Sequence, residues 1–167
     1  LRRFLEVDEI NSVVVAMHPD WKDYAVGLLV RHGIDMARVR IVDGGTTRFE
    51  SLIALARTCV TIADACGVAE EPVMISHDCA RPFVSAEILK ANIAALADYD
   101  VVTTSIPTID TVLLSRNGKE SDSVPDRSTV FLDQGPQAVK LRHFLGLAES
   151  LSSEERARYI EAGRLYL

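Results

Sequence analysis

Residues 39–66 read VRIVDGGTTRFESLIALARTCVTIADAC, and this stretch decides the fold class. Its first five residues are rich in β-branched side chains and predict a strand, and GGTTR at 44–48 follows as a glycine-led turn. A helix is predicted over about 48–66, because apolar residues recur there at spacings of three and four. These residues are Leu52, Leu55, Cys59, Ile62 and Cys66. The stretch is therefore a strand–turn–helix unit.

The same alternation of strand and helix signals continues on both sides of this unit. The predicted strands are 11–17, 39–43, 72–76 and 100–106, and the predicted helices are 20–32, 48–66 and 85–97. Asp20 and Ser85 are the expected N-caps of the first and third helices, because their side chains can accept a hydrogen bond from a free N–H group. Strands that alternate with helices predict an α/β fold with a mainly parallel sheet and helices on its faces.

The pattern changes after residue 107. Residues 109–119 predict a strand that runs into an Asn-Gly turn, so we expect a protruding β-hairpin arm over 107–128. Two further helices are predicted over 137–149 and 152–162, and SSEE at the start of the second resembles a capping box. The composition shows no break or internal repeat, and we expect one domain over 1–167.

The composition excludes several classes of protein. Of the 167 residues, 48% are hydrophobic and 25% charged, as in ordinary globular domains, and no apolar run approaches the roughly 20 residues of a membrane helix. A formal net charge of −6 argues against a general nucleic-acid binder. Three cysteines without a CxxC pair favour a cytoplasmic protein, with Cys59 and Cys66 expected in the core.

In parallel sheets, ligands bind beyond the carboxyl ends of the strands, so the loops at these ends are the candidate sites. In GGTTRFES, Gly44 and Gly45 allow the backbone to approach a ligand closely, and the helix start that follows favours an anion. Arg48 and Ser51 lie three residues apart, on one face of the first helical turn. A simple strand-to-helix connection with a solvated arginine is the alternative.

The loop SHDCARPF, residues 76–83, follows the strand at 72–76. Asp78 is a natural ligand for hydrated Mg²⁺ or a ribose hydroxyl, and Arg81 could clamp a phosphate as a forked donor. His77 has no nucleophile near it in the sequence, and a structural role is expected for it. Cys79 has no histidine at a spacing that indicates a nucleophile.

Two later loops offer further polar residues. PTIDTVLL supplies Asp110 and Thr111, and VPDRS supplies Asp126 and Arg127, with turn formation or a surface ion pair as the alternative. Zinc-ligand spacing, a Walker A loop, a GxGxxG motif and a GxSxG elbow are all absent from the sequence. The residues alone therefore indicate an α/β protein that binds a phosphorylated small molecule.

Six loops in order carry a family resemblance: HPDW (18–21), GGTTRFES (44–51), HDCARPF (77–83), PTIDT (107–111), PDRS (125–128) and QGPQ (134–137). Together they resemble the cytidylyltransferases that make CDP-linked polyol phosphates. That family includes the 2-C-methyl-D-erythritol 4-phosphate enzymes of isoprenoid synthesis and the ribitol-5-phosphate enzymes of teichoic-acid synthesis. HPDW, the hairpin and the VPDRS spacing look closer to the ribitol branch, which we expect.

The resemblance implies a Rossmann-like nucleotidyltransferase sandwich. It also implies an acceptor phosphate that attacks the α-phosphate of CTP, release of pyrophosphate, a requirement for Mg²⁺ or another divalent cation, and a homodimer. By position, the implied nucleotide-binding residues are Gly44, Gly45, Arg48, Ser51, Asp78 and Cys79. Asp78 is also the implied metal ligand, and with Arg81 it forms the implied catalytic pair.

The polyol-phosphate side of the implied site comprises Arg81, Thr111 and Arg127, with Arg127 reaching across the dimer. Asp110 and Gln137 match helper positions, which we expect to be structural. The sequence departs from the family pattern because it contains neither the glycine-rich loop with its lysine nor the C-terminal segment with another lysine. We therefore expect that this sequence is part of a longer enzyme, and an intact mass well above 18.3 kDa would support this. A non-catalytic nucleotide-binding or dimerisation module is the alternative.

Overall fold

The computed structural model describes residues 1–159 and 161–166. Its helices are α1 (Arg2–Leu5), α2 (Lys22–Arg31), α3 (Arg48–Ala65), α4 (Ala86–Ala95), α5 (Leu141–Ser150) and α6 (Ser153–Arg156). Its strands are β1 (Val13–Met17), β2 (Val39–Asp43), β3 (Val73–Ser76), β4 (Val101–Pro107) and β5 (Phe131–Lys140). Among the described residues, every helix is too short or too polar to cross a membrane.

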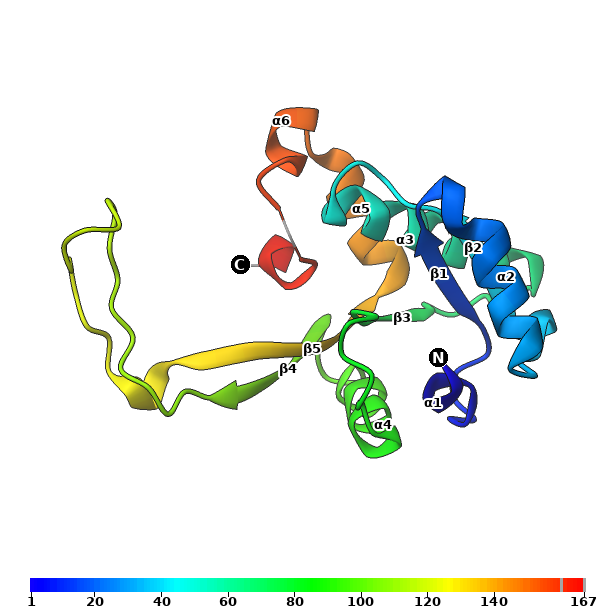
Figure 1. Cartoon of the computed structure of the whole chain (residues 1–167), viewed down its shortest axis with the longest axis horizontal. Coiled ribbons are helices and arrows are strands. Elements are labelled where there is room, and N and C mark those ends of the chain that lie inside the picture. Colours follow the sequence, from blue (N-terminus) through cyan, green and yellow to red (C-terminus); the bar gives the residue numbers. More distant parts are fainter. Residues whose placement is uncertain (160, 167) are drawn as a thin grey trace.

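The strands form two sheets. β1 pairs with β2 in parallel, from Val13 opposite Val39 to Met17 opposite Asp43. In the second sheet β5 lies between β3 and β4 and is antiparallel to both. Helices α3 and α5 lie on one side of this second sheet and α4 on the other (Figure 1). The expected α/β fold is confirmed, with parallel pairing in the first sheet and a hairpin of β4 and β5 in the second.

The start of one predicted helix is wrong. The helix predicted over 137–149 begins at Leu141, because residues 137–140 are the end of β5. Gln137, Ala138 and Val139 are buried between two neighbouring strands, so their backbone groups form ladders on both sides. This long-range pairing outweighs the local helix signal.

The segment between β4 and β5 extends away from the body as a long arm, residues 108–130 (Figure 1). The strand predicted over 109–119 is absent from this described segment, where one bridge joins Leu114 and Ser123. A two-stranded ribbon without a third strand or a covering helix has little to stabilise regular pairing. The Asn-Gly turn is present, with Gly118 at φ 70° and the Asn117 side chain accepting from Lys119 N at 2.9 Å.

The core lies between α3, α5 and the second sheet. Phe49 and Phe144 are fully buried and meet edge to face, with their ring centroids 6.4 Å apart. The buried face of α3 is rotated from the predicted stripe and comprises Phe49, Leu52, Ile53, Ala56 and Ala63. Cys59 is half-buried against this core, whereas Cys66 is exposed at the end of the helix, so its predicted core position is wrong.

The predicted caps can be compared with the helix starts. Ser85 caps α4 through its hydrogen bond with Ile88 N, and Ser152 forms the predicted capping box with Glu155. Asp20 does not cap the helix after β1: His18 accepts from Asp20 N, and a single 3₁₀ turn precedes α2. The helix predicted over 152–162 ends at Arg156, and residue 160 lies outside the described residues.

Candidate functional site

The glycine-led turn GGTTR connects β2 to α3 and is held by close contacts. Gly45 N donates to Ser51 Oγ at 3.0 Å, and Thr47 forms a capping box with Glu50. A Cβ on Gly45 would lie 2.3 Å from Glu50 Cβ and 2.8 Å from the Glu50 carbonyl carbon, so this position requires glycine. Hydrogen bonds, first from the Thr46 side chain and then from Thr47 N, lower the pKa of Glu50. The turn is thus fixed before any ligand binds.

The loop after β3 places an aspartate between two arginines. Arg48 Nη2 at the start of α3 lies 2.9 Å from Asp78 Oδ1, and Arg81 Nε lies 3.8 Å from Asp78 Oδ2. These side chains are 44–47% exposed, so the ion pairs contribute little to stability. Their effect is positional, because Asp78 holds both guanidinium groups at one side of a pocket.

His77 fixes the same loop. Its Nε2 lies 2.7 Å from the Arg81 carbonyl oxygen, which can only accept, so Nε2 carries the proton. Its Nδ1 is buried and has no hydrogen-bond partner among the described residues. The centroids of the His77 and Phe4 rings lie 5.8 Å apart. The structural role predicted for His77 agrees with these contacts.

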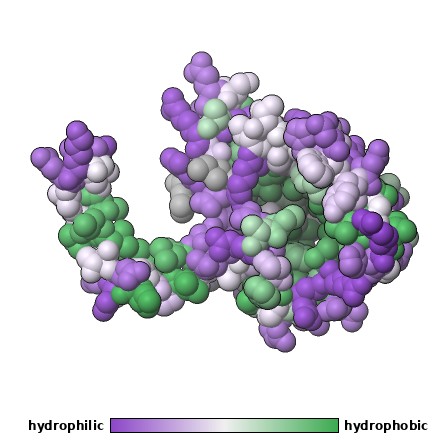
Figure 2. All heavy atoms as spheres, in the orientation of Figure 1, coloured by the Kyte–Doolittle hydropathy of each residue, from purple (hydrophilic) through white to green (hydrophobic). Residues whose placement is uncertain are grey.

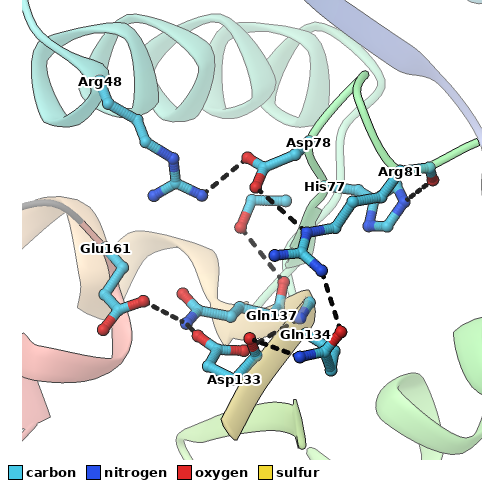
Figure 3. Close-up of a pocket in the computed structure, with 10 residues that line it drawn as sticks. Arg48, His77, Asp78, Arg81, Asp133, Gln134, Gln137 and Glu161 are labelled. Atoms are coloured by element: carbon cyan, nitrogen blue, oxygen red, sulfur yellow. Dashed lines mark hydrogen bonds and ion pairs between the residues drawn. The ribbon is translucent and has the colours of Figure 1, made fainter.

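The floor of the pocket is formed by β5 and the C-terminal segment (Figure 3). Arg81 Nη1 donates to Gln134 Oε1 at 3.0 Å, which links the arginine to β5. Gln137 Nε2 donates to Asp133 Oδ2 at 2.6 Å and to Glu161 Oε2 at 3.2 Å. The pocket encloses about 200 Å³, with cationic residues on one wall and carboxylates on its floor.

The two floor carboxylates have opposite pKa shifts. A hydrogen bond with Asp133, then burial and the charge of Asp133, raise the pKa of Glu161. Burial tends to raise the pKa of Asp133, but hydrogen bonds from Gly135 N, Glu161, Thr103 and Gln137 outweigh it and lower that pKa. Asp133 is therefore the charged partner, and Glu161 is the more easily protonated one.

The structure brings together only part of the predicted site. Arg48, Asp78 and Arg81 line the pocket, whereas Gly44, Gly45 and Ser51 lie beside it at the start of α3. Cys79 is exposed and is not a lining residue of this pocket. Thr111 and Arg127 lie in the arm, where Arg127 Nη1 donates to Ile109 O at 3.1 Å. The arm carries both away from the pocket of the same chain (Figure 1).

Two pocket residues lie outside every motif quoted from the sequence: Asp133 and Glu161. Asp133 directly precedes the family-like QGPQ motif, of which Gln134 is the first residue, and this motif was the available signal. Glu161 stands in YIEAG, which has no motif of its own. It joins the pocket because the segment after α6 returns to β5, a contact that local pattern does not reveal.

Comparison with known families gives one family match. The family model described as "IspD: 2-C-methyl-D-erythritol 4-phosphate cytidylyltransferase" matches residues 1–159, nearly the whole chain.

Solved structures with this fold include three bacterial proteins. 4-Diphosphocytidyl-2C-methyl-D-erythritol synthase from Anaerococcus prevotii DSM 20548 has a TM-score of 0.78 and 24% identity, covering 99% of this chain and 67% of that one. 2-C-Methyl-D-erythritol 4-phosphate cytidylyltransferase from Francisella tularensis has a TM-score of 0.73 and 17% identity, covering 98% and 70%. The enzyme of that name from Thermus thermophilus has a TM-score of 0.68 and 21% identity, covering 99% and 69%. The chain thus spans about two thirds of their length.

Proposed function

Since this chain belongs to the 2-C-methyl-D-erythritol 4-phosphate cytidylyltransferase family, we propose that it transfers CMP from CTP to 2-C-methyl-D-erythritol 4-phosphate. In this reaction an oxygen of the acceptor phosphate bonds to the α-phosphorus of CTP, and the bond to the leaving pyrophosphate breaks. The observation that carries the proposal is the Arg48–Asp78–Arg81 arrangement in a pocket of about 200 Å³, within a chain of this family.

The acceptor is the finer part of the proposal. The sequence favoured ribitol 5-phosphate, on the basis of HPDW, the hairpin and the VPDRS spacing. The family model and the structures described above all carry methylerythritol names, so 2-C-methyl-D-erythritol 4-phosphate now stands first. Ribitol 5-phosphate remains the competing acceptor, and both are small polyol phosphates.

The proposed site residues have roles that their geometry supports. Arg48 and Arg81 present guanidinium groups that suit phosphate oxygens, and charge neutralisation is the main requirement of phosphoryl transfer. Asp78 orients both arginines through its two carboxylate oxygens. Gly45 and Ser51 form the ordered turn beside them, where the base of the nucleotide would bind.

A divalent cation is part of the proposal. The described residues contain no group of three or more ligand side chains that could hold a metal alone. Mg²⁺ is commonly bound by one or two carboxylates together with substrate phosphates, and Asp78 supplies such a carboxylate at the pocket wall. This donor suits a Mg²⁺ ion that arrives with CTP. When bound, the cation would offset the charge of the triphosphate.

The arm supports a homodimer as a further part of the proposal. Apolar side chains gather along the arm below a polar tip (Figure 2), and Ile109 and Leu113 are 83% and 62% exposed. An exposed apolar surface of this kind is typical of an interaction site. We place Thr111 and Arg127 of one subunit at the acceptor end of the partner's pocket. Mixing Arg127→Ala with Arg81→Ala subunits should then restore activity that neither variant has alone.

A cytoplasmic location is supported by the unpaired cysteines. Cys66 and Cys79 are exposed free thiols, which persist in a reducing compartment. The formal net charge of −6 supports a small-molecule substrate over nucleic acid.

The direct test is an activity assay on the full-length protein. CTP, UTP, ATP and GTP are each combined with Mg²⁺ and either acceptor, and pyrophosphate and the CDP-linked product are measured. We expect turnover with CTP and 2-C-methyl-D-erythritol 4-phosphate that Asp78→Ala and Arg81→Ala abolish. Faster turnover of ribitol 5-phosphate would overturn the acceptor, and CTP binding without turnover would indicate a non-catalytic module.

A further inference from the structure

Two carboxyl groups meet at the floor of the pocket, Asp133 from β5 and Glu161 from the C-terminal segment (Figure 3). Between them lies the amide of Gln137, which is only 6% exposed. Its single Nε2 donates one hydrogen to Asp133 Oδ2 at 2.6 Å and the other to Glu161 Oε2 at 3.2 Å. The amide thereby holds two acidic groups next to each other.

The two carboxyl groups are not equivalent. Asp133 Oδ1 accepts two further hydrogen bonds, from Gly135 N at 2.9 Å and from Thr103 Oγ1 at 3.0 Å. These donors favour a charged Asp133, whereas a second charge beside it would be repelled. A proton on Glu161 removes that repulsion and supplies a donor to Asp133. The contacts therefore favour one proton shared by the pair and residing mainly on Glu161.

The cationic wall of the pocket acts on the same proton. Asp133 and burial raise the pKa of Glu161, whereas the hydrogen bond from Gln137 and then the positive charge of Arg48 on α3 lower it. Arg81, Asp78 and His77, on the loop after β3, are the other charged or titratable groups that line this pocket. A phosphate group bound to Arg48 and Arg81 would offset their positive charge. The pair would then hold its proton more tightly.

We propose that Glu161 is a positioning residue that shares one proton with Asp133, and that a phosphate bound at Arg48 and Arg81 is taken up together with that proton. The shared proton ties the C-terminal segment to β5. It also keeps in place the strand that carries Gln134, the residue that holds Arg81 Nη1. The inference deepens the proposed function and rests on it, because CTP is the phosphate-bearing ligand.

The test measures CTP binding by calorimetry at pH 5 to 8, with Mg²⁺, on the full-length protein. Glu161→Gln keeps the shape of the protonated acid without its titration, and Glu154→Gln on α6 is the matched control. Because a bound phosphate would raise the pair's pKa, we expect CTP binding to be about 3- to 10-fold weaker at the alkaline end than at the acid end. We expect this loss in wild type and Glu154→Gln, and not in Glu161→Gln. Comparison with the variant cancels the titration of CTP itself.

A ligand-free measurement tests the shared proton separately. A raised pKa of Glu161 contributes stability that is complete below its unfolded value and is lost as pH rises through its folded value. The midpoint of urea unfolding should therefore fall with pH relative to Glu161→Gln. Equal pH dependence in both proteins would overturn the shared proton.

The remaining outcomes separate the inference from the proposed function. The unfolding data could show the shared proton while CTP binding has the same pH dependence in wild type and Glu161→Gln. That result would overturn only the coupling between phosphate binding and the proton. Proton release in the presence of Mg²⁺ would show that the pair binds a cation, which also overturns it. Failure to bind CTP at every pH would refute the proposed function. The pH dependence of inorganic pyrophosphate binding, in wild type and Glu161→Gln, would then decide whether phosphate binding is coupled to the shared proton.

Discussion

Replacement of Gly45 by alanine is the sharpest test of how the nucleotide side of the site is built. The new Cβ would lie 2.3 Å from Glu50 Cβ, 2.8 Å from the Glu50 carbonyl carbon and 2.9 Å from Ser51 N. Two of these three atoms belong to the backbone of the first turn of α3, so the clash cannot be relieved by a side-chain rotation. The turn itself must shift.

The expected cost follows from this displacement. Overpacking at a rigid site costs about 1–3 kcal/mol, and weakening the Thr47 capping box adds part of the roughly 0.5–2 kcal/mol that a cap contributes. A loss of about 2 kcal/mol would lower the melting temperature of a chain of this size by about 4–8 °C. CTP binding should weaken as well, because the hydrogen bond from Gly45 N to Ser51 Oγ is disturbed.

Urea and thermal unfolding followed by circular dichroism measure this loss. Gly146→Ala is the matched control, because Gly146 lies in α5 and a Cβ there would meet nothing within 4 Å. That control should gain about 0.5–1 kcal/mol from the lower chain entropy of alanine. A Gly45→Ala protein as stable as wild type, beside a control that shows its gain, would refute the reasoning.

Three further perturbations test other contacts. Arg48→Lys should weaken CTP binding roughly tenfold in calorimetry, because lysine lacks the planar guanidinium group that can hold two phosphate oxygens. Stability should barely change, because the ion pair with Asp78 is half-exposed. Unchanged affinity would remove Arg48 from the site. Burial raises the pKa of Cys59 to about 11, so a thiol reagent at pH 8 should react quickly with two cysteines and slowly with Cys59, and three fast thiols would contradict its burial. The hydrogen bond from Lys140 lowers the pKa of Asp100, so Asp100→Asn should reduce stability at pH 7. This loss should begin to shrink as pH falls below the ordinary value of 3.8 and should disappear once pH has fallen through the lowered pKa of folded Asp100. A loss that persists in acid would contradict the pairing.

The site residues that could be predicted from the sequence lie just after the ends of predicted strands. Arg48 and Asp78 stand just after predicted strands, and the carboxyl ends of strands are where an α/β sheet collects its polar groups. The pocket does bring these two residues within 2.9 Å of each other. Local pattern placed each residue after its own strand, whereas the contact between them joins the ends of two separate sheets.

The part that could not be predicted depends on long-range pairing. Residues 137–140 were predicted to begin a helix, yet they belong to β5, and residues 137–139 pair with β3 on one side and β4 on the other. The same strand carries Asp133 and Gln137, and the Gln137 side chain donates hydrogen bonds to both Asp133 and Glu161. Asp133 and Glu161 are far apart in the sequence. Neither partner belongs to a recognisable motif, so only the folded chain brings the two acids together.

The central claim is that Arg48, Asp78 and Arg81 form the phosphate side of a CTP site, and a crystal structure of the protein with CTP and Mg²⁺ tests it most directly. We predict phosphate oxygens within hydrogen-bonding distance of both arginines, with the cation on the Asp78 carboxylate. A triphosphate bound elsewhere, with the ion pairs of Asp78 to both arginines unchanged, would contradict the account.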